Sequence, residues 1–283
     1  MITRKAYAKV NIGLDVVGKR PDGYHEVRMI MQTVSIHDTL AFEKAGRDVT
    51  LTIDGCDLPT DDNNLIVKAA KLFMNTYGIE EGVRISLAKR IPVAAGMAGG
   101  STDAAAVFLG LRDLFSVKVT DEELMKLSVK IGADVPYCIM GGTALAEGIG
   151  EKLTRLKDIP EAWLLIAKPD IDVSTAFVYG NLKLNTVSKH PDIDTQLKAI
   201  EGSDIYTLCG KMGNVLETVT VPAYPVIDTI KQYMKEAGAL NALMSGSGPT
   251  VFGVFDDCNK RDRAYEMLKD KGYAKTVLKA VFV

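Results

Sequence analysis

The chain has 283 residues, of which 47% are hydrophobic and 25% are charged, and its formal net charge is −2. This is an ordinary globular mixture with enough apolar side chains for a sizeable core, and the length suits two domains. Lysines and arginines are spread along the chain, which argues against a nucleic-acid surface or a polybasic arm for anionic membranes. The start "MITRKAYAKV" lacks the apolar core of a signal peptide, and no apolar run approaches a membrane span in length.

The four cysteines, Cys56, Cys138, Cys209 and Cys258, are far apart in the sequence. None of their spacings suits a paired zinc site. We therefore expect reduced thiols in a cytosolic protein.

The first elements in chain order are strands. Residues 5–17 carry apolar side chains at every second position from Ala8 to Val16, with polar side chains between them. That alternation predicts a strand with one buried face and one polar face. After the turn "GKRPDGY", residues 25–42 and 48–54 are expected to form further strands.

Helical patterns follow. Residues 63–78 have apolar side chains at helical spacing, with an asparagine at the front and Gly78 at the back. Residues 83–90 predict another strand, which leads into a glycine-rich segment. Further along, Thr120 with Glu123 three residues later is a capping-box pattern, which predicts the N-terminus of a helix.

The pattern restarts beyond about residue 152. "AWLLIAKP" predicts a short buried strand, and helical segments follow, the last clear one ending near Gly238. "ALNALMSGSGPTVFGVF" predicts a strand, a glycine turn and a strand, before a helix over 259–271 and a final strand. The sequence therefore predicts a mixed α/β (α+β) protein of two domains, 1–152 and 153–283, with the Lys-, Asp- and Pro-rich stretch 154–161 as the linker.

The segment "IPVAAGMAGGSTDAAAVFLGL" places Gly96, Gly99 and Gly100 where the chain enters a predicted helix. A helix N-terminus has unsatisfied N–H groups and about half a unit of positive charge, so it attracts anions. Glycines remove the Cβ atoms that would keep a phosphate off the backbone, and Ser101 or Thr102 can cap the helix. The spacing is neither a Walker A loop nor G-x-G-x-x-G. From composition alone, phosphate binding and close packing of helix on strand both remain open.

Three further features are candidates for the chemistry. Lys9, on the polar face of the first strand, is either a source of positive charge for a phosphate or a solvated surface lysine. The segment "SGSGPT", residues 245–250, either packs beside the first glycine segment, binds phosphate or forms a tight hairpin turn. Asp134 falls between a helix stop at Gly132 and an apolar strand entered through Pro136. It is either a proton acceptor or a turn aspartate that bonds its own backbone.

Taken together, these segments resemble the three signature motifs of GHMP-superfamily kinases: "AKVNIGLDV", "PVAAGMAGGSTDAA" and "GSGPTVFGVF". The segments "AYAKVNIGLDVVGKRPDGYHEV", "DDNNLI", "GADVPYCIMGGTALAEGIGE" and "PDIDVSTAFVY" resemble the branch that phosphorylates CDP-methylerythritol, and the resemblance covers nearly the full length. The resemblance implies a ribosomal-S5-like ATP domain followed by a ferredoxin-like domain. It also implies the use of ATP and Mg²⁺ and a role in isoprenoid precursor synthesis.

The resemblance assigns roles to particular residues. Lys9 and Asp134 would be the catalytic pair: Asp134 takes or orients the proton of the acceptor hydroxyl, while Lys9 holds that hydroxyl and balances developing charge. The ATP phosphates would lie against Pro92, Val93, Ala94, Ala95, Gly96, Met97, Ala98, Gly99, Gly100, Ser101 and Thr102. Ser101 would be the hydroxyl nearest to Mg²⁺. The adenosine pocket would contain Asn64, Leu65 and Lys89, and the cytidine-bearing acceptor would meet Asn11, Tyr24, His25 and Tyr179.

Some positions depart from the pattern of the family. Ala95 and Ala98 replace glycines found in many members, Met97 replaces a leucine and Thr102 replaces a serine. Asp103, in the first helical turn, either repels the phosphates, binds Mg²⁺ through water or serves the helix, whose dipole favours an acidic first turn.

Two other functions are weighed against this one. Another kinase of the superfamily, such as a mevalonate-branch or homoserine kinase, is disfavoured by "RPDGYHEV" and Tyr179. A catalytically silent nucleotide-binding member is disfavoured by the intact Lys9, Asp134 and Ser101. We expect a small-molecule partner only, without nucleic acid or membrane, and a monomer or weak homodimer.

Overall fold

The computed structural model describes residues Met1–Val283 and divides into two compact units. The first unit comprises Met1–Ala8, Ile36–Ile91 and Ala98–Gly141, and the second comprises Lys9–Ser35, Pro92–Met97 and Gly142–Val283. Strands β1 (Ile2–Lys19) and β2 (His25–Lys44) are long enough to contribute residues to both units.

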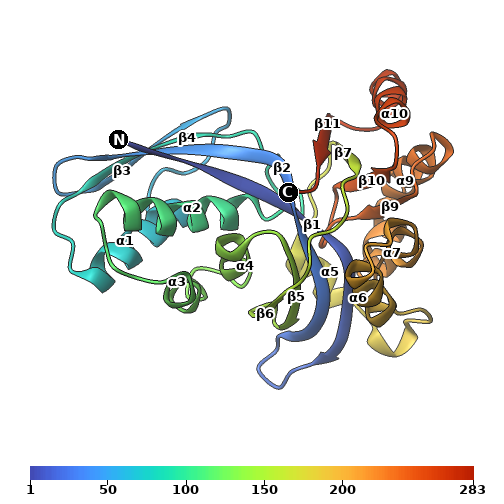
Figure 1. Ribbon diagram of the computed structural model, residues 1–283, viewed down its shortest axis with the longest axis horizontal. Coiled ribbons are helices and arrows are strands. Elements are labelled where there is room, and N and C mark those ends of the chain that lie inside the picture. The colour runs from blue at the N-terminus through green and yellow to red at the C-terminus, as the bar shows by residue number, and fades with distance from the viewer. The chain divides into compact units, whose positions relative to one another are not determined.

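The first unit is a sheet covered by helices (Figure 1). The second half of β2 pairs antiparallel with β4 (Val83–Ala88), and β3 (Val49–Asp54) pairs parallel with β4. Its helices are α1 (Leu65–Tyr77), α2 (Gly99–Leu114), α3 (Asp121–Ser128) and α4 (Val135–Met140). Gly110 lets α2 approach β2 closely, because a Cβ there would lie 2.5 Å from the Phe42 ring. The apolar stripes of α1 and α2 thereby reach the sheet and bury the rings of Phe42, Phe73 and Phe108.

The second unit contains the other part of the long strands and a separate four-stranded sheet. The first half of β2 pairs with β5 (Thr143–Gly148), which also pairs with β6 (Lys152–Arg155), while β8 (Gly213–Asn214) runs parallel to β1. The separate antiparallel sheet has the order β11-β7-β10-β9, formed by Thr276–Val281, Trp163–Lys168, Val251–Phe255 and Asn241–Met244.

Seven short helical segments accompany these strands. They are α5 (Thr175–Asn181), η1 (Leu184–Thr186), α6 (Ile193–Glu201), α7 (Ile205–Lys211), α8 (Glu217–Ala223), α9 (Val226–Glu236) and α10 (Cys258–Lys271). Helices α9 and α10 pack on the four-stranded sheet (Figure 1), whose strands β7 and β10 are almost wholly buried. None of the helices has the length and apolarity needed to cross a membrane.

Local sequence signals placed most elements correctly. The side chain of Asn64 caps α1, Gly78 ends it with a φ of 63°, and Thr120 with Glu123 forms the predicted capping box. One prediction was wrong: the residues after Asp134 form α4 instead of a strand. Pro136 suits the first turn of a helix, and an apolar run this short does not distinguish a buried helix from a buried strand.

Two other predictions need adjustment. The expected linker 154–161 begins inside β6, whose residues up to Arg155 pair with β5. The polar face expected on the first strand is enclosed by protein, since Lys9, Asn11 and Asp15 are at most 8% exposed. A run of polar side chains buried along one strand is uncommon, because each of them needs a partner to offset its lost hydration.

Candidate active site

The predicted phosphate segment has an unusual backbone. Gly96 has a φ of 67°, and two alanines, Ala94 at 51° and Ala98 at 57°, also occupy the left-handed region that favours glycine. Ala98 is the N-cap residue of α2, and no side chain caps this helix. The first N–H groups of α2 therefore have no side-chain acceptor, which leaves them for an anion.

The two residues predicted to cap α2, Ser101 and Thr102, do not do so. The Thr102 hydroxyl donates to the carbonyl of Tyr7 at 2.6 Å, so the expectation that it caps α2 was wrong. Ser101 lies half-buried in the first turn of α2 without forming a cap. Because Thr102 is the fourth residue of α2, its side chain points back along the helix to the strand that it bonds.

The three glycines of this segment are also packed closely. A Cβ on Gly96 would lie 2.3 Å from the Ser245 carbonyl oxygen, and the Ser245 hydroxyl donates to the Gly96 carbonyl at 2.9 Å. The two glycine segments therefore pack side by side, one of the options that the sequence left open. A Cβ on Gly99 would lie 3.1 Å from the Lys89 ammonium, and one on Gly100 would lie 3.3 Å from Leu65. Close packing and an open helix N-terminus thus coexist here.

Lys9 is buried with a polar partner. The residue is only 5% exposed, and its ammonium donates to the Asn11 side-chain oxygen at 2.7 Å. The Asn11 amide nitrogen lies 3.3 Å from the Met29 sulfur. These contacts fix the direction of both side chains. A buried ammonium is a strong site for negative charge, because little water competes with it.

Asp134 immediately precedes α4 and is half-buried. Its backbone carbonyl accepts the N–H of Cys138 at 3.1 Å, whereas its side chain forms no cap on α4. Lys9 belongs to the second unit and Asp134 to the first.

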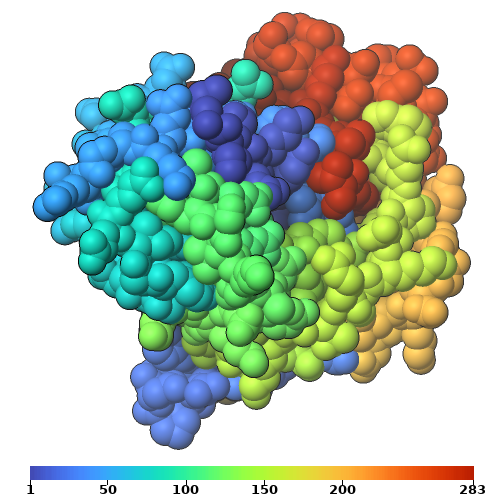
Figure 2. Space-filling model, turned by 60° about the vertical axis from the view of Figure 1, so that its left-hand side comes forward, coloured from blue at the N-terminus to red at the C-terminus, as the bar shows by residue number.

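The aromatic residues predicted to meet the acceptor lie in the second unit. The rings of His25 and Tyr179 are 5.1 Å apart at 42°, and burial, with a smaller contribution from Lys19, lowers the pKa of His25. Tyr24 is 61% exposed in the turn between β1 and β2, whose tip is the blue projection in Figure 2. The structure thus brings together His25 and Tyr179, which are far apart in the chain, while their role toward the acceptor stays a prediction.

Two of the residues predicted to line the adenosine pocket form hydrogen bonds or ion pairs within the protein. The Asn64 side chain accepts the N–H of Ile66 at 2.9 Å and donates to the Pro59 carbonyl at 2.7 Å. Leu65 begins α1. Lys89 has only 5% of its side chain exposed, and its ammonium lies 2.5 Å from Asp38 and 2.7 Å from Asp103.

Asp38 is a functional candidate that sequence reasoning missed. It is completely buried, and one of its oxygens accepts the N–H groups of Arg90 and Ile91, at the entrance to the glycine segment. An acidic residue within a predicted strand was the only signal that it gave. Burial raises the pKa of Asp103 to about 7, although Lys89 opposes this shift.

Comparison with known proteins identifies the family. The model described as "GHMP kinases N terminal domain" matches residues 64–142, and "GHMP kinases C terminal" matches residues 196–274. The chain belongs to the GHMP kinases. Two relatives are named 4-diphosphocytidyl-2-C-methyl-D-erythritol kinase. That of Lachnoclostridium phytofermentans is 52% identical, covering 97% of this chain and 95% of its own, and that of Lachnospira eligens is 52% identical, covering 98% and 96%.

Solved structures agree with this GHMP kinase in fold. A crystal structure of 4-(cytidine 5'-diphospho)-2C-methyl-D-erythritol kinase matches with a TM-score of 0.84 and 32% identity over 99% of each chain. Homoserine kinase from Cytophaga hutchinsonii matches with a TM-score of 0.75 at 19% identity, over 97% of this chain and 93% of its own. At that identity the likeness establishes the fold alone.

The sequence predicts that Mg²⁺ accompanies ATP, and the side chains present can be tested against such a metal. Nowhere in the chain do three or more His, Cys, Asp or Glu side chains gather to hold a metal ion. The residues present fit a cation bound mainly by phosphate oxygens, with Ser101 at the uncapped start of α2 as the protein hydroxyl.

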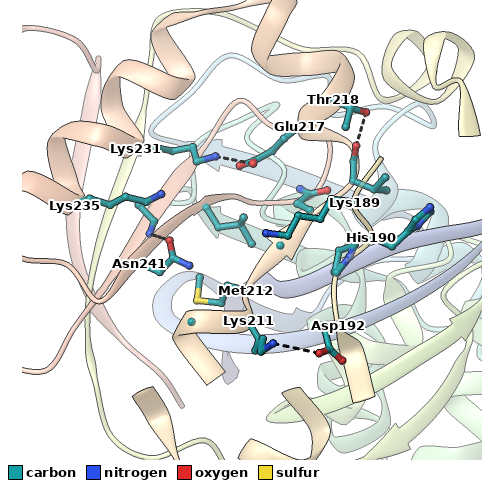
Figure 3. A pocket seen from close by; sticks show the side chains of 17 residues that line it. Lys189, His190, Asp192, Lys211, Met212, Glu217, Thr218, Lys231, Lys235 and Asn241 are labelled. Atoms are coloured by element: carbon teal, nitrogen blue, oxygen red, sulfur yellow. Dashed lines mark hydrogen bonds and ion pairs between the residues drawn. The ribbon is translucent and has the colours of Figure 1, made fainter. Parts of the chain in front are cut away.

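A separate cavity of about 470 Å³ lies in the second unit of this GHMP kinase (Figure 3). Four lysines line it, but Lys231 pairs with Glu217 at 2.6 Å and Lys211 pairs with Asp192 at 3.5 Å. None of the predicted site residues lines this cavity. It contributes nothing to the function proposed below.

Proposed function

We propose that this GHMP kinase transfers the γ-phosphoryl group of ATP to the 2-hydroxyl of 4-diphosphocytidyl-2-C-methyl-D-erythritol, giving the 2-phosphate and ADP. The observation that carries the proposal is the 52% identity, over 97% of the chain, with a relative of that name. The reaction belongs to the non-mevalonate route to isoprenoid precursors, and we place it in the cytosol. The division at residues 152 and 153 stays a prediction.

The phosphate site proposed for ATP is residues 92–102. Phosphoryl transfer needs alignment and charge stabilisation more than covalent help. The uncapped N–H groups of α2 and the helix dipole supply both without a lysine in the loop. Mg²⁺, when bound with the nucleotide beside Ser101, neutralises charge on the phosphates. Asn64, Leu65 and Lys89 form the edge of the adenosine pocket in this proposal.

Lys9 and Asp134 are the proposed catalytic pair. The Asp134 side chain, which is not used as a helix cap, accepts the proton of the acceptor hydroxyl. The Lys9 ammonium, held at 2.7 Å by Asn11, fixes the hydroxyl oxygen and stabilises charge that develops on it. Burial strengthens this second effect, since a desolvated ammonium acts through a lower effective dielectric constant.

The cytidine end of the acceptor is proposed to bind at Asn11, Tyr24, His25 and Tyr179. The 5.1 Å separation of the His25 and Tyr179 rings supports a shared aromatic site. Stacking on an aromatic side chain contributes about 1–3 kcal/mol per base in single-strand binding proteins. Binding energy from the base then positions the distant hydroxyl for reaction.

The test is ADP release by the purified chain with Mg-ATP and, in parallel, CDP-methylerythritol, phosphomevalonate or homoserine. We expect turnover with the cytidine compound alone, and Asp134→Asn is expected to lower kcat by about 100-fold or more because the proton acceptor is lost. The matched control is Asp170→Asn, whose carboxylate is 74% exposed and pairs with Lys275. It should react like the wild type.

Each alternative function has its own outcome in this assay. Turnover with phosphomevalonate or homoserine would retain the kinase and refute the acceptor site. ATP binding without turnover of any acceptor would favour a silent nucleotide-binding member. Full activity in Asp134→Asn would remove Asp134 from the catalytic pair.

A further inference from the structure

Three buried charged side chains meet where the chain enters and leaves the glycine segment. Lys89 is 5% exposed at its side chain, Asp38 is 0% and Asp103 is 4%. The single ammonium lies 2.5 Å from one carboxylate and 2.7 Å from the other. At these distances both contacts are short charge-assisted hydrogen bonds. Asp38 lies in β2, Lys89 directly follows β4 and Asp103 lies in α2, so the three residues join separate elements of the first unit.

The bonds reach both ends of the segment between Ile91 and Gly99. On the entry side, Asp38 accepts the N–H groups of Arg90 and Ile91 at 2.5 and 2.8 Å. On the exit side, Asp103 lies in α2, one turn beyond Gly99. Gly99 itself leaves the room for this contact, because a Cβ there would lie 3.1 Å from the Lys89 ammonium. One ammonium thus ties the residues before the loop to the helix after it.

The segment between these ends needs such a restraint. Ala94 and Ala98 have φ values of 51° and 57°, which are unfavourable for any residue with a Cβ. Strained backbone of this kind persists only where the surrounding structure fixes it. Burying one ammonium with two carboxylates is also costly, and one oxygen of Asp103 is buried without a hydrogen-bond partner. Apolar packing would hold these elements together at a lower cost in free energy. The charged arrangement therefore indicates that the orientation of the segment matters as well as its attachment.

We propose that Asp38, Lys89 and Asp103 form a charge clamp that sets the geometry of the ATP phosphate loop, and that Asp103 is a positioning residue for phosphate binding. This rests on the proposed use of residues 92–102 to bind phosphate. The clamp assigns the Lys89 ammonium to the two carboxylates. Lys89 then contributes to the adenosine pocket only through its backbone and the aliphatic part of its side chain.

The test measures binding to the full chain by calorimetry without acceptor, using ADP and inorganic tripolyphosphate as separate probes. Tripolyphosphate carries phosphates but no nucleoside. For Asp103→Ala, which cannot reach Lys89, we expect both ligands to bind about ten- to a hundredfold more weakly, as for other small misplacements of a site. Asp103→Asn keeps an oxygen acceptor and is expected to restore most of the binding. Asp170→Ala, in the exposed pair with Lys275 at 2.8 Å, is the control that should change neither.

The outcomes separate the clamp from other roles. Weaker ADP binding with unchanged tripolyphosphate binding would make Lys89 and Asp103 part of the nucleoside pocket and overturn the clamp. Unchanged binding of both ligands in Asp103→Ala would overturn it too, as would failure of Asp103→Asn to improve on Asp103→Ala. Asp103→Ser, also too short to reach Lys89, replaces Asp103→Ala if that variant does not fold. If the wild type bound neither probe, the phosphate loop and the clamp would both be wrong. Because no acceptor is present, an error in the acceptor's identity does not affect these results.

Discussion

Two alanines in the phosphate segment adopt backbone angles that glycine adopts more readily. Ala98, the N-cap of α2, has a φ of 57°. A Cβ in this region costs roughly 1–2 kcal/mol. Replacing alanine by glycine relieves that strain, but part of the gain is lost because glycine has more conformational freedom in the unfolded chain. The strain is therefore local to one side chain and removable by one substitution.

We expect Ala98→Gly to raise the free energy of unfolding by about 0.5–1 kcal/mol, measured by urea denaturation. Ala105→Gly is the control, because Ala105 lies inside the same helix and is buried. It should lower the stability by about 1 kcal/mol or more. A loss of stability in Ala98→Gly would show that the methyl group contributes more than the strain costs.

Asp103 gives the stability a pH dependence with a defined sign. Its pKa is raised from 3.8 to about 7, chiefly by burial, in an environment that includes Lys89, Asp38 and Cys56. The folded chain therefore binds this proton more tightly than the unfolded chain. Stability from this group is greatest below pH 4 and declines as the pH rises to about 7.

Asp103→Asn should remove this dependence. We expect the variant to be more stable than the wild type at pH 8, with the difference shrinking toward pH 4, since one pKa unit corresponds to about 1.4 kcal/mol. Urea denaturation between pH 4 and 8 measures the effect. A parallel pH profile in both proteins would contradict the assigned titration.

At the scale of elements, the two glycine segments depend on each other. Ser245 precedes the turn between β9 and β10, and its carbonyl oxygen would lie 2.3 Å from a Cβ on Gly96. The Ser245 oxygen belongs to the backbone, which cannot move aside for an added Cβ as a flexible side chain would. The hydrogen bond from the Ser245 hydroxyl to the Gly96 carbonyl fixes the same contact.

Gly96→Ala is therefore expected to cost about 1–3 kcal/mol of stability and to weaken ATP binding, because overpacking displaces the loop. Gly18→Ala is the control, since the nearest atom to its added Cβ would be 4.0 Å away. Thermal unfolding and the KM for ATP together measure both effects. Equal behaviour of the two variants would mean that the contact at Gly96 is not constraining.

At the scale of the whole molecule, the metal is expected to act with the nucleotide instead of supporting the fold. No cluster of three or more metal-binding side chains is present in the chain. EDTA should abolish phosphoryl transfer but leave the melting temperature of the ligand-free protein unchanged. Mg-ATP at 100 times its Kd should stabilise the fold by about 2.7 kcal/mol. A lower melting temperature in EDTA would instead indicate a structural metal.

Most elements were predictable because their signals act over a few residues. Alternation gave β1, and caps gave the ends of α1 and the start of α3. Motif order also sufficed for the family, which the matches to both halves of the GHMP kinases confirm. The roles of the individual site residues stay predictions.

The sequence by itself thus determined most of the elements, the caps of α1 and α3, and the family. Only the tertiary structure decided that α4 is a helix, that Lys9 is buried with Asn11 and that Lys89 binds Asp38 and Asp103. The physical reason is range. Periodicity and capping depend on neighbours within one or two turns, whereas burial and charge pairing depend on residues that folding brings together, such as Asp38 and Lys89, 51 positions apart.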